Sequence, residues 1–176
     1  GGGRGGSGVP VPRRRDPGLP ASMRAGRRPG VSHAGTYGGF SGAACGERIA
    51  DSQSHILVTI DGYYRNGELI DHKVKADEAV ARAKEQGFEV AKVLVWRRHP
   101  GQYASASPMV EGRDFFIDEL LTGYTGAVVE PVSMPAEAPL FLMYTSGTPV
   151  RPTGAQPPPR GTAAPFPRWT TRSDGW

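Results

Sequence analysis

Three short runs of consecutive apolar residues stand out along the middle of the chain. They lie at 56–60, 93–96 and 140–144 and read ILVTI, VLVW and LFLMY. Unbroken runs of this length are typical of strands that are buried on both faces of a parallel sheet. Polar or small residues follow each run, beginning with Asp61, Arg97 and Thr145. We therefore predict three strands, each leading into a loop.

Between these runs, apolar residues recur at the three- and four-residue spacing of helical faces. Ser41 can cap the first helix, which ends near position 52, although Gly42 and Gly46 each weaken it by roughly 1 kcal/mol relative to Ala. Gly87 and Gly123 are suited to end the second and third helices. The apolar faces comprise Cys45 and Ile49 in the first helix, Ala76, Ala79, Val80 and Ala83 in the second, and Phe116, Ile117, Leu120 and Leu121 in the third.

Strand and helix alternate with short connections, and a polar loop at 97–111 precedes the third helix. This order predicts an α/β fold of layered βαβ units with right-handed crossovers. The charged residues of the helices are interpreted as solvated faces rather than as catalytic carboxylates. They include Asp77, Glu78, Arg82, Lys84 and Glu85 in the second helix, and Asp114, Asp118 and Glu119 around the third.

The two ends of the chain differ in composition from its centre. Residues 1–30 hold seven Arg, no Lys, nine Gly and five Pro, and residues 151–176 hold four Arg, no Lys and the run PPP. Such segments have little to bury, so we predict that both are disordered around a folded part at 31–150. The folded part is acidic, with ten Lys and Arg against fifteen Asp and Glu.

The high pI therefore belongs to the ends, where Arg-Gly-rich sequence can bind single-stranded nucleic acid through charge and stacking. Residues 1–30, however, contain no Phe, Tyr or Trp, and 151–176 contain only Phe166, Trp169 and Trp176. Because the aromatic residues needed for stacking are scarce, a nucleic-acid partner is not expected.

Cysteine and histidine usage indicates neither a disulfide nor a metal site. Cys45 is the only cysteine, and it is interpreted as a small buried hydrophobe. His33, His55, His72 and His99 lack metal-ligand spacing and are interpreted as surface or hydrogen-bonded residues. With no apolar run near the roughly 20 residues that span a bilayer, and no secretory signal, a cytoplasmic protein is expected.

The last apolar run leads directly into Thr145, Ser146, Gly147 and Thr148. Glycine lets backbone N–H groups approach phosphate oxygens, and hydroxyl groups add donors without bulk. On its own, a TSGT loop after a strand is more often an ordinary turn than a phosphate-binding loop. The Walker pattern G-x-x-x-x-G-K-[ST] does not occur.

Several separated segments, taken in order, make the pattern specific. PLFLMYTSGT at 139–148 resembles the signature of the adenylate-forming (AMP-binding) superfamily, usually YTSGTTGxPKG. PMVEGRD at 108–114, YGGFS at 37–41 and the stretch 61–67 resemble acetyl-CoA synthetases of that superfamily. The resemblance covers about 30–154 and extends faintly to PGLPA at 17–21, where the family has a helix. The chain is thus identified as a fragment of the large N-terminal α/β domain of such an enzyme.

The resemblance implies a ligase that uses ATP, Mg²⁺ and CoA. A carboxylate such as acetate attacks the α-phosphate of ATP, pyrophosphate leaves, and the CoA thiol then displaces AMP from the acyl-adenylate. Carried over by position, Thr145, Ser146, Gly147 and Thr148 would hold the ATP phosphates. Tyr37, Gly38 and Gly39 match an aromatic-Gly-Gly segment of the CoA site, and Arg65 matches an arginine that pairs with a CoA phosphate.

Four positions depart from the family pattern. Pro149 and Val150 replace Thr-Gly after TSGT, and Thr153 replaces the lysine of the PKG element. Val resists the positive φ angles that Gly adopts, and Thr cannot supply a charge-assisted contact to a triphosphate. Glu68 replaces a second basic residue of the CoA site. The alternatives to a ligase are a noncatalytic nucleotide- or CoA-binding remnant and an Arg-rich interaction protein, and the fragment alone is expected to be inactive.

Overall fold

A computed structural model of the chain describes residues 6–11, 18–37, 39–99, 101–135, 138, 141–144 and 154–155. The strands of its main sheet are β1 (Gly6–Val11), β2 (Ser32–Tyr37), β3 (Ile56–Ile60), β6 (Lys92–Trp96), β7 (Asp114–Phe116), β8 (Phe141–Tyr144) and β9 (Gly154–Ala155). They lie in the order β7-β6-β3-β1-β2-β8-β9. All of their pairings are parallel except that of β8 with β9.

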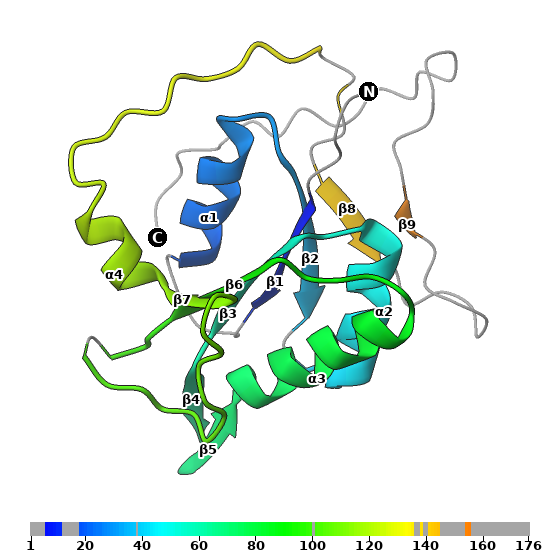
Figure 1. Cartoon of the computed structure of the whole chain (residues 1–176), viewed down its shortest axis with the longest axis vertical. Coiled ribbons are helices and arrows are strands. Elements are labelled where there is room, and N and C mark those ends of the chain that lie inside the picture. The colour runs from blue at the N-terminus through cyan, green and yellow to red at the C-terminus, as the bar shows by residue number, and fades with distance from the viewer. Residues whose placement is uncertain are drawn as a thin grey trace, which may run out of the picture.

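Helices cover both faces of this sheet. They are α1 (Gly18–Arg27), α2 (Gly42–Ser52), α3 (His72–Glu85) and α4 (Ile117–Thr122). Helices α1 and α4 lie on one side, and α2 and α3 lie on the other (Figure 1). The chain moves from β1 to β2 in one direction and from β2 past β1 to β3 in the other. Because these two connections run in opposite directions, right-handed crossovers place their helices, α1 and α2, on opposite faces of the sheet. The structure is therefore the predicted layered α/β fold.

The predicted strands and helices at the centre of the chain are confirmed. The three apolar runs form β3, β6 and β8. The Ser41 hydroxyl accepts a hydrogen bond from the Ala44 amide at 3.2 Å and caps α2. Gly87 follows α3 with a φ angle of +80°, which glycine adopts at low cost.

The core lies between α2, α3 and the sheet. Its buried residues are Cys45, Ile49, Leu57, Ala76, Ala79, Ala83, Val90, Val93 and Val95. Six of these nine come from the two predicted helical faces and from the run 56–60, so the apolar pattern identified most of the core. Burial raises the pKa of the Cys45 thiol, as expected for the small hydrophobe that the sequence indicates.

Four elements differ from the sequence prediction. Inside the range 1–30, where disorder is predicted, the structure places β1 and α1, and inside the range 151–176 it places β9. The other residues of 151–176 lie outside the described part of the chain. Strand β1 pairs through its backbone with both β2 and β3, and backbone pairing does not depend on an apolar composition. Phe116 was predicted on the third helical face, but it is the last residue of β7 and pairs with Val95. Helix α4 therefore begins one residue later, and of its residues only Ile117 is buried.

Gly46 allows α2 and α3 to pack closely. A Cβ atom at this position would lie 2.5 Å from the Ala79 carbonyl oxygen and 2.6 Å from the Arg82 Cβ. Both neighbours belong to α3, and a backbone carbonyl in a helix cannot move away on its own. The glycine that weakens α2 as an isolated helix is therefore required by its packing.

A hairpin, β4 (Gly62–Arg65) and β5 (Glu68–Asp71), extends from the end of β3 (Figure 1). Its turn residues Asn66 and Gly67 have φ angles of +54° and +85°, as a tight two-residue turn requires. The hairpin packs on the start of α3, where the His72 ring stacks on Tyr63 at 5.2 Å. His72 is 2% exposed, and its Nε2 atom has no hydrogen-bond partner within the described residues.

Substituting Gly46 by alanine tests the helix packing. Alanine improves helix propensity by about 1 kcal/mol, whereas overpacking against α3 costs about 1–3 kcal/mol. We expect Gly46→Ala to lower the free energy of unfolding, measured by urea denaturation. Gly26→Ala is the matched control, because the space around Gly26 in α1 is open, and it should not destabilise the protein. A Gly46→Ala variant as stable as the control would contradict the packing.

The buried His72 predicts a loss of stability in mild acid. Burial lowers its pKa from 6.5 to about 4, so the folded protein keeps the ring neutral where the unfolded chain binds a proton. The free energy of unfolding therefore keeps its full value above pH 6.5. It falls by on the order of 2–3 kcal/mol as the pH decreases to about 4. His72→Gln should flatten the fall of melting temperature over this range. The exposed His99→Gln should not, and equal pH profiles for the two variants would contradict the assignment.

Candidate functional site

The carboxyl ends of β2 and β8 lie side by side at one edge of the sheet. His33 of β2 pairs with Phe141 and Ala34 pairs with Leu142, and the strands are parallel. Tyr144 at the end of β8 thus reaches the level of Thr36, one residue before β2 ends at Tyr37. In open α/β sheets, ligands bind at this edge, close to the point where the strand order reverses. Here the reversal occurs at β1, the neighbour of β2.

Three of the eight residues predicted to bind ligands are among the described residues. Tyr37 ends β2, Gly39 lies in the turn that follows, and Arg65 ends β4 in the hairpin. Gly38 lies outside the described residues, as do Thr145, Ser146, Gly147 and Thr148. Strand β8 therefore brings the chain to the Tyr37–Gly39 edge immediately before the TSGT tetrad. None of the described contacts joins Arg65 to Tyr37 or Gly39, because β1 and β3 separate the hairpin from β2.

Side-chain contacts with α2 fix the end of β8. The Tyr144 hydroxyl donates to the Asp51 carboxylate at 2.9 Å and lies 3.3 Å from the Arg48 carbonyl oxygen. Burial, together with the hydrogen bond and charge of Asp51, raises the pKa of Tyr144 well above its usual value. The phenol is therefore a hydrogen-bond donor at every physiological pH. It positions the strand end and is unsuited to act as a base.

Asp61 anchors the loop that follows β6. Its side chain is fully buried and accepts hydrogen bonds from the amides of Gly62 at 2.7 Å, Arg98 at 3.0 Å and Ala104 at 3.1 Å. Its carbonyl oxygen accepts from the first two amides of α3, those of His72 and Lys73. One residue at the end of β3 thus joins the hairpin, α3 and the 97–104 loop. The sequence places Asp61 at the end of a strand and at the start of the matched stretch 61–67, and it does not predict these hydrogen bonds.

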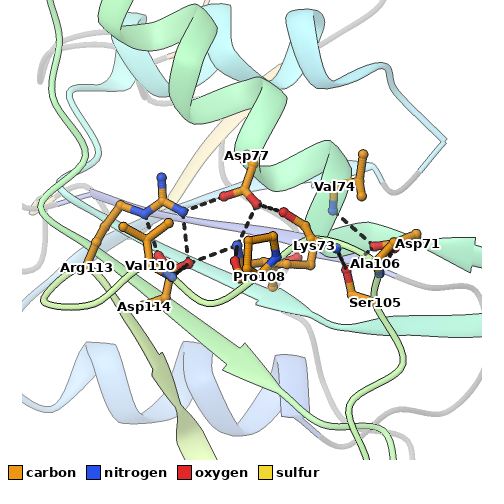
Figure 2. A network of polar contacts seen from close by, with 12 residues as sticks. Asp71, Lys73, Val74, Asp77, Ser105, Ala106, Pro108, Val110, Arg113 and Asp114 are labelled. Carbon is orange, nitrogen blue, oxygen red and sulfur yellow. Dashed lines mark hydrogen bonds and ion pairs between the residues drawn. The ribbon is translucent and has the colours of Figure 1, made fainter.

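Three further aspartates hold the rest of this loop (Figure 2). Asp71 caps α3 through the Val74 amide and accepts from the Ser105 hydroxyl at 2.7 Å and the Ala106 amide at 2.8 Å. Asp77 accepts from the Ser107 hydroxyl, and Asp114 accepts from the Val110 amide at 2.9 Å. The loop predicted to be merely polar is therefore held at intervals along its whole length.

A buried lysine links two of these carboxylates. The Lys73 side chain is 0% exposed, and its Nζ lies 2.6 Å from Asp77 and 2.9 Å from Asp114, with the Pro108 carbonyl at 3.3 Å (Figure 2). Arg113 completes the cluster with ion pairs to the same two aspartates at 2.5 Å. Every charge has a partner of opposite sign, as burial requires.

The pKa values of these aspartates indicate a structural role. Burial opposes ionisation of Asp114, but hydrogen bonds from Arg113, Lys73 and Val110 outweigh it and hold the pKa of Asp114 below its ordinary range. Burial likewise opposes ionisation of Asp71, and its bonds from Ser105, Val74 and Ala106 lower its pKa. Both groups stay ionised near neutral pH, so neither is suited to act as a general acid or base.

The interpretation of the carboxylates as solvated helix faces was wrong for three residues. Asp77 is a quarter exposed and lies in the ion-pair cluster, Asp114 is buried at the start of β7, and Asp118 binds Arg97. A helical periodicity cannot reveal cations that approach from distant segments. Histidines were also misjudged in part, because His33 and His72 are buried and each has one ring nitrogen without a described partner.

An open pocket of about 540 Å³ lies between α2, α3 and β8. Its lining carries two arginines and two carboxylates, and consists of Glu47, Arg48, Ala50, Asp51, Arg82, Gln86 and Tyr144. In the described part of the chain, no group of three or more His, Cys, Asp or Glu residues could hold a metal ion. Among the described helices, none has the length and apolar character needed to cross a bilayer.

Comparison with known proteins gives a consistent family. No protein-family model matches the chain. It is 39% identical over 139 residues to an acetyl-coenzyme A synthetase of Pyrobaculum aerophilum, covering 78% of this chain and 20% of that protein. It is 41% identical over 133 residues to the acetyl-coenzyme A synthetase of Rhizobium rhizogenes, covering 76% of this chain and 20% of that protein. A 3-hydroxypropionyl-coenzyme A synthetase of Sulfurisphaera tokodaii is 38% identical over 127 residues, 72% of this chain and 18% of that protein.

The fold matches as well. The structure aligns with acetoacetyl-CoA synthetase from Streptomyces lividans at a TM-score of 0.66 and 18% identity, over 86% of this chain and 21% of that one. The chain spans about a fifth of the length of the curated relatives that it matches. Sequence identity and shared fold together show that the chain belongs to the acetyl-CoA synthetase group of the adenylate-forming, AMP-binding superfamily.

Proposed function

We propose that this chain carries the ATP-phosphate and CoA contacts of an AMP-forming acyl-CoA ligase that activates acetate or a similar short acid. One observation supports this most strongly. Strands β2 and β8 are parallel neighbours, so the two segments that match the family's CoA and ATP sites leave the sheet at one edge. Segments separated by about a hundred residues in sequence thus start from adjacent positions.

The proposed chemistry divides between the two segments. The amides and hydroxyls of Thr145, Ser146, Gly147 and Thr148 hold the phosphates of ATP while a carboxylate oxygen attacks the α-phosphorus and pyrophosphate leaves. Tyr37, Gly38 and Gly39 receive CoA, whose thiol attacks the acyl carbon and releases AMP. Mg²⁺ would offset charge on the phosphates.

The hairpin places a cation and an acid together where CoA phosphate is proposed to bind. Arg65 and Glu68 pair directly across β4 and β5, and both are exposed. An exposed guanidinium can bind phosphate in a bidentate manner. Glu68 lies beside it and lowers the local positive potential, so the proposed CoA contact is weaker than two basic residues would provide.

The ATP loop is also proposed to be impaired. Val150 stands where the family pattern has a glycine, and Thr153 stands where it has a lysine. A charge-assisted contact to the triphosphate strengthens as charge develops in the transition state. Losing this contact therefore slows adenylation more than it weakens ATP binding. These two positions favour the second candidate function, a chain that binds ATP and CoA without completing adenylation.

In the proposed function the chain binds only small molecules, namely a short acid, ATP and CoA. We also propose that the protein is cytoplasmic. The single cysteine, Cys45, is buried, which is compatible with a reducing compartment. No nucleic-acid partner is proposed, because the part of the chain at 31–150 is acidic.

Binding of ATP and CoA to the purified chain, measured by isothermal titration calorimetry, tests the proposal directly. We expect both ligands to bind, and we expect acetate-dependent exchange of labelled pyrophosphate into ATP to be slow or undetectable because of Val150 and Thr153. Failure of both ligands to bind would contradict the proposed function. Pyrophosphate exchange at a rate of about 1–10 s⁻¹, typical of intact enzymes, would contradict the impairment alone.

A charge-neutralising variant sharpens the CoA measurement. Glu68→Gln should tighten CoA binding by about threefold at low ionic strength and by less at 0.5 M salt, because the repelled phosphate is exposed and screened. Glu130→Gln removes an equally exposed acid that lies after α4, and it should leave the CoA affinity unchanged. Equal effects of the two variants would show that the hairpin does not bind CoA.

A further inference from the structure

The Arg48 guanidinium contacts two aromatic rings that come from different parts of the chain. Its guanidinium carbon is 4.2 Å from the centre of the Phe40 ring and 5.5 Å from the centre of the Tyr144 ring. Arg48 is in the middle of α2 and is 8% exposed. Both distances are within the range in which a cation is attracted to the face of an aromatic ring.

The two rings flank the two segments of the proposed site. Phe40 follows Gly39 directly and precedes the cap residue of α2. Tyr144 is the last residue of β8 and immediately precedes Thr145. The Tyr144 hydroxyl also lies 3.3 Å from the Arg48 carbonyl oxygen, so this residue contacts Tyr144 through both its side chain and its backbone.

The guanidinium has few other means of stabilisation. One NH group donates to the Ala44 carbonyl at 2.5 Å, and Nε is buried without a partner. No ion pair with Arg48 occurs among the described residues; there, Glu47 pairs with Arg82 and Asp51 accepts from Tyr144. Among these residues the ring faces are therefore the main favourable partners of the guanidinium, and each ring is in turn held at the position of the cation.

We propose that Arg48 is a positioning residue that holds the Gly39–Phe40 turn and the end of β8 in a fixed relation. The proposal rests on the proposed function, in which these segments lead to the CoA and ATP contacts. Its consequence is that a single residue in α2, which touches neither ligand, sets the geometry of both binding segments. A residue that supported only one segment would affect only one ligand.

The test compares ATP and CoA dissociation constants for variants of the full chain. Arg48→Met keeps an unbranched apolar stem and loses the charged guanidinium, and it should weaken both ligands by about fivefold or more. Phe40→Leu should weaken CoA mainly, and Tyr144→Phe, which loses only the hydroxyl contacts, should weaken ATP mainly. Arg48→Lys restores a cation and should recover part of both affinities. Arg82→Met alters the other arginine of the same pocket, which contacts no ring in the described contacts, and should change neither by more than twofold.

Hydrogen exchange separates failure of this proposal from failure of the proposed function. In Arg48→Met, amide exchange should accelerate by about tenfold both at 40–45 and at 141–144, while β3 and β6 keep their protection. If the wild-type chain binds neither ligand, the exchange pattern alone decides. Acceleration of one segment only, or of neither, overturns the proposal, as does loss of affinity for a single ligand. Should Arg48→Met loosen β3 and β6 as well, Arg48→Lys is used in its place. A smaller acceleration of exchange at both segments supports the proposal, and acceleration at one segment only, or at neither, overturns it.

Discussion

The parallel pairing of β8 with β2 is the constraint on which the candidate site depends. The chain builds the sheet outward from β1 to β7 on one side and then returns across it to add β8 beside β2. Parallel strands share a carboxyl edge, so this return brings the end of β8 next to the end of β2. The distance along the sequence between positions 37 and 145 then no longer matters. Any residue that fixes the pairing or the strand ends, as Tyr144 and Arg48 do, acts on the site as a whole.

A second constraint concerns the chain between β6 and β7, which has little regular structure. Several of its amides and hydroxyls donate to aspartates from four places, namely Asp61 just after β3, Asp71 of the hairpin, Asp77 of α3 and Asp114 of β7. The buried Lys73 pairs with two of these carboxylates, the buried Asp114 and the quarter-exposed Asp77. Removing one member of such a cluster leaves an uncompensated charge and typically costs about 3–5 kcal/mol. The cluster therefore specifies one arrangement of the loop and of the hairpin that carries Arg65.

The sequence predicted those features that depend on local pattern. Apolar runs identified β3, β6 and β8, because a strand that is buried on both faces is apolar throughout. Helical spacing identified α2 and α3, because a helix that is buried on one face has apolar residues every three or four positions. It did not predict β1 or the partners of Lys73 and Asp61, because those depend on segments that meet only in the fold. Gly46 was read as a weakness of α2, since the approach of α3 that requires it is not visible in the sequence. For the site, the matched motifs predict Tyr37, Gly38, Gly39, Arg65 and the tetrad 145–148, and these stay predictions. The proposed role of Arg48 emerged only from its contacts with two rings in the fold.

The central claim is that the segments after β2 and β8 form one ligand-binding edge. Backbone amide NMR of the isotope-labelled chain during titration with ATP tests it most directly. The account predicts that the largest shifts occur at the end of β8 and just beyond it, together with Gly39 and Phe40 in the turn after the neighbouring strand β2. Shifts confined to the hairpin or to α4, with the amides of Gly39 and Tyr144 unchanged at saturation, would contradict it.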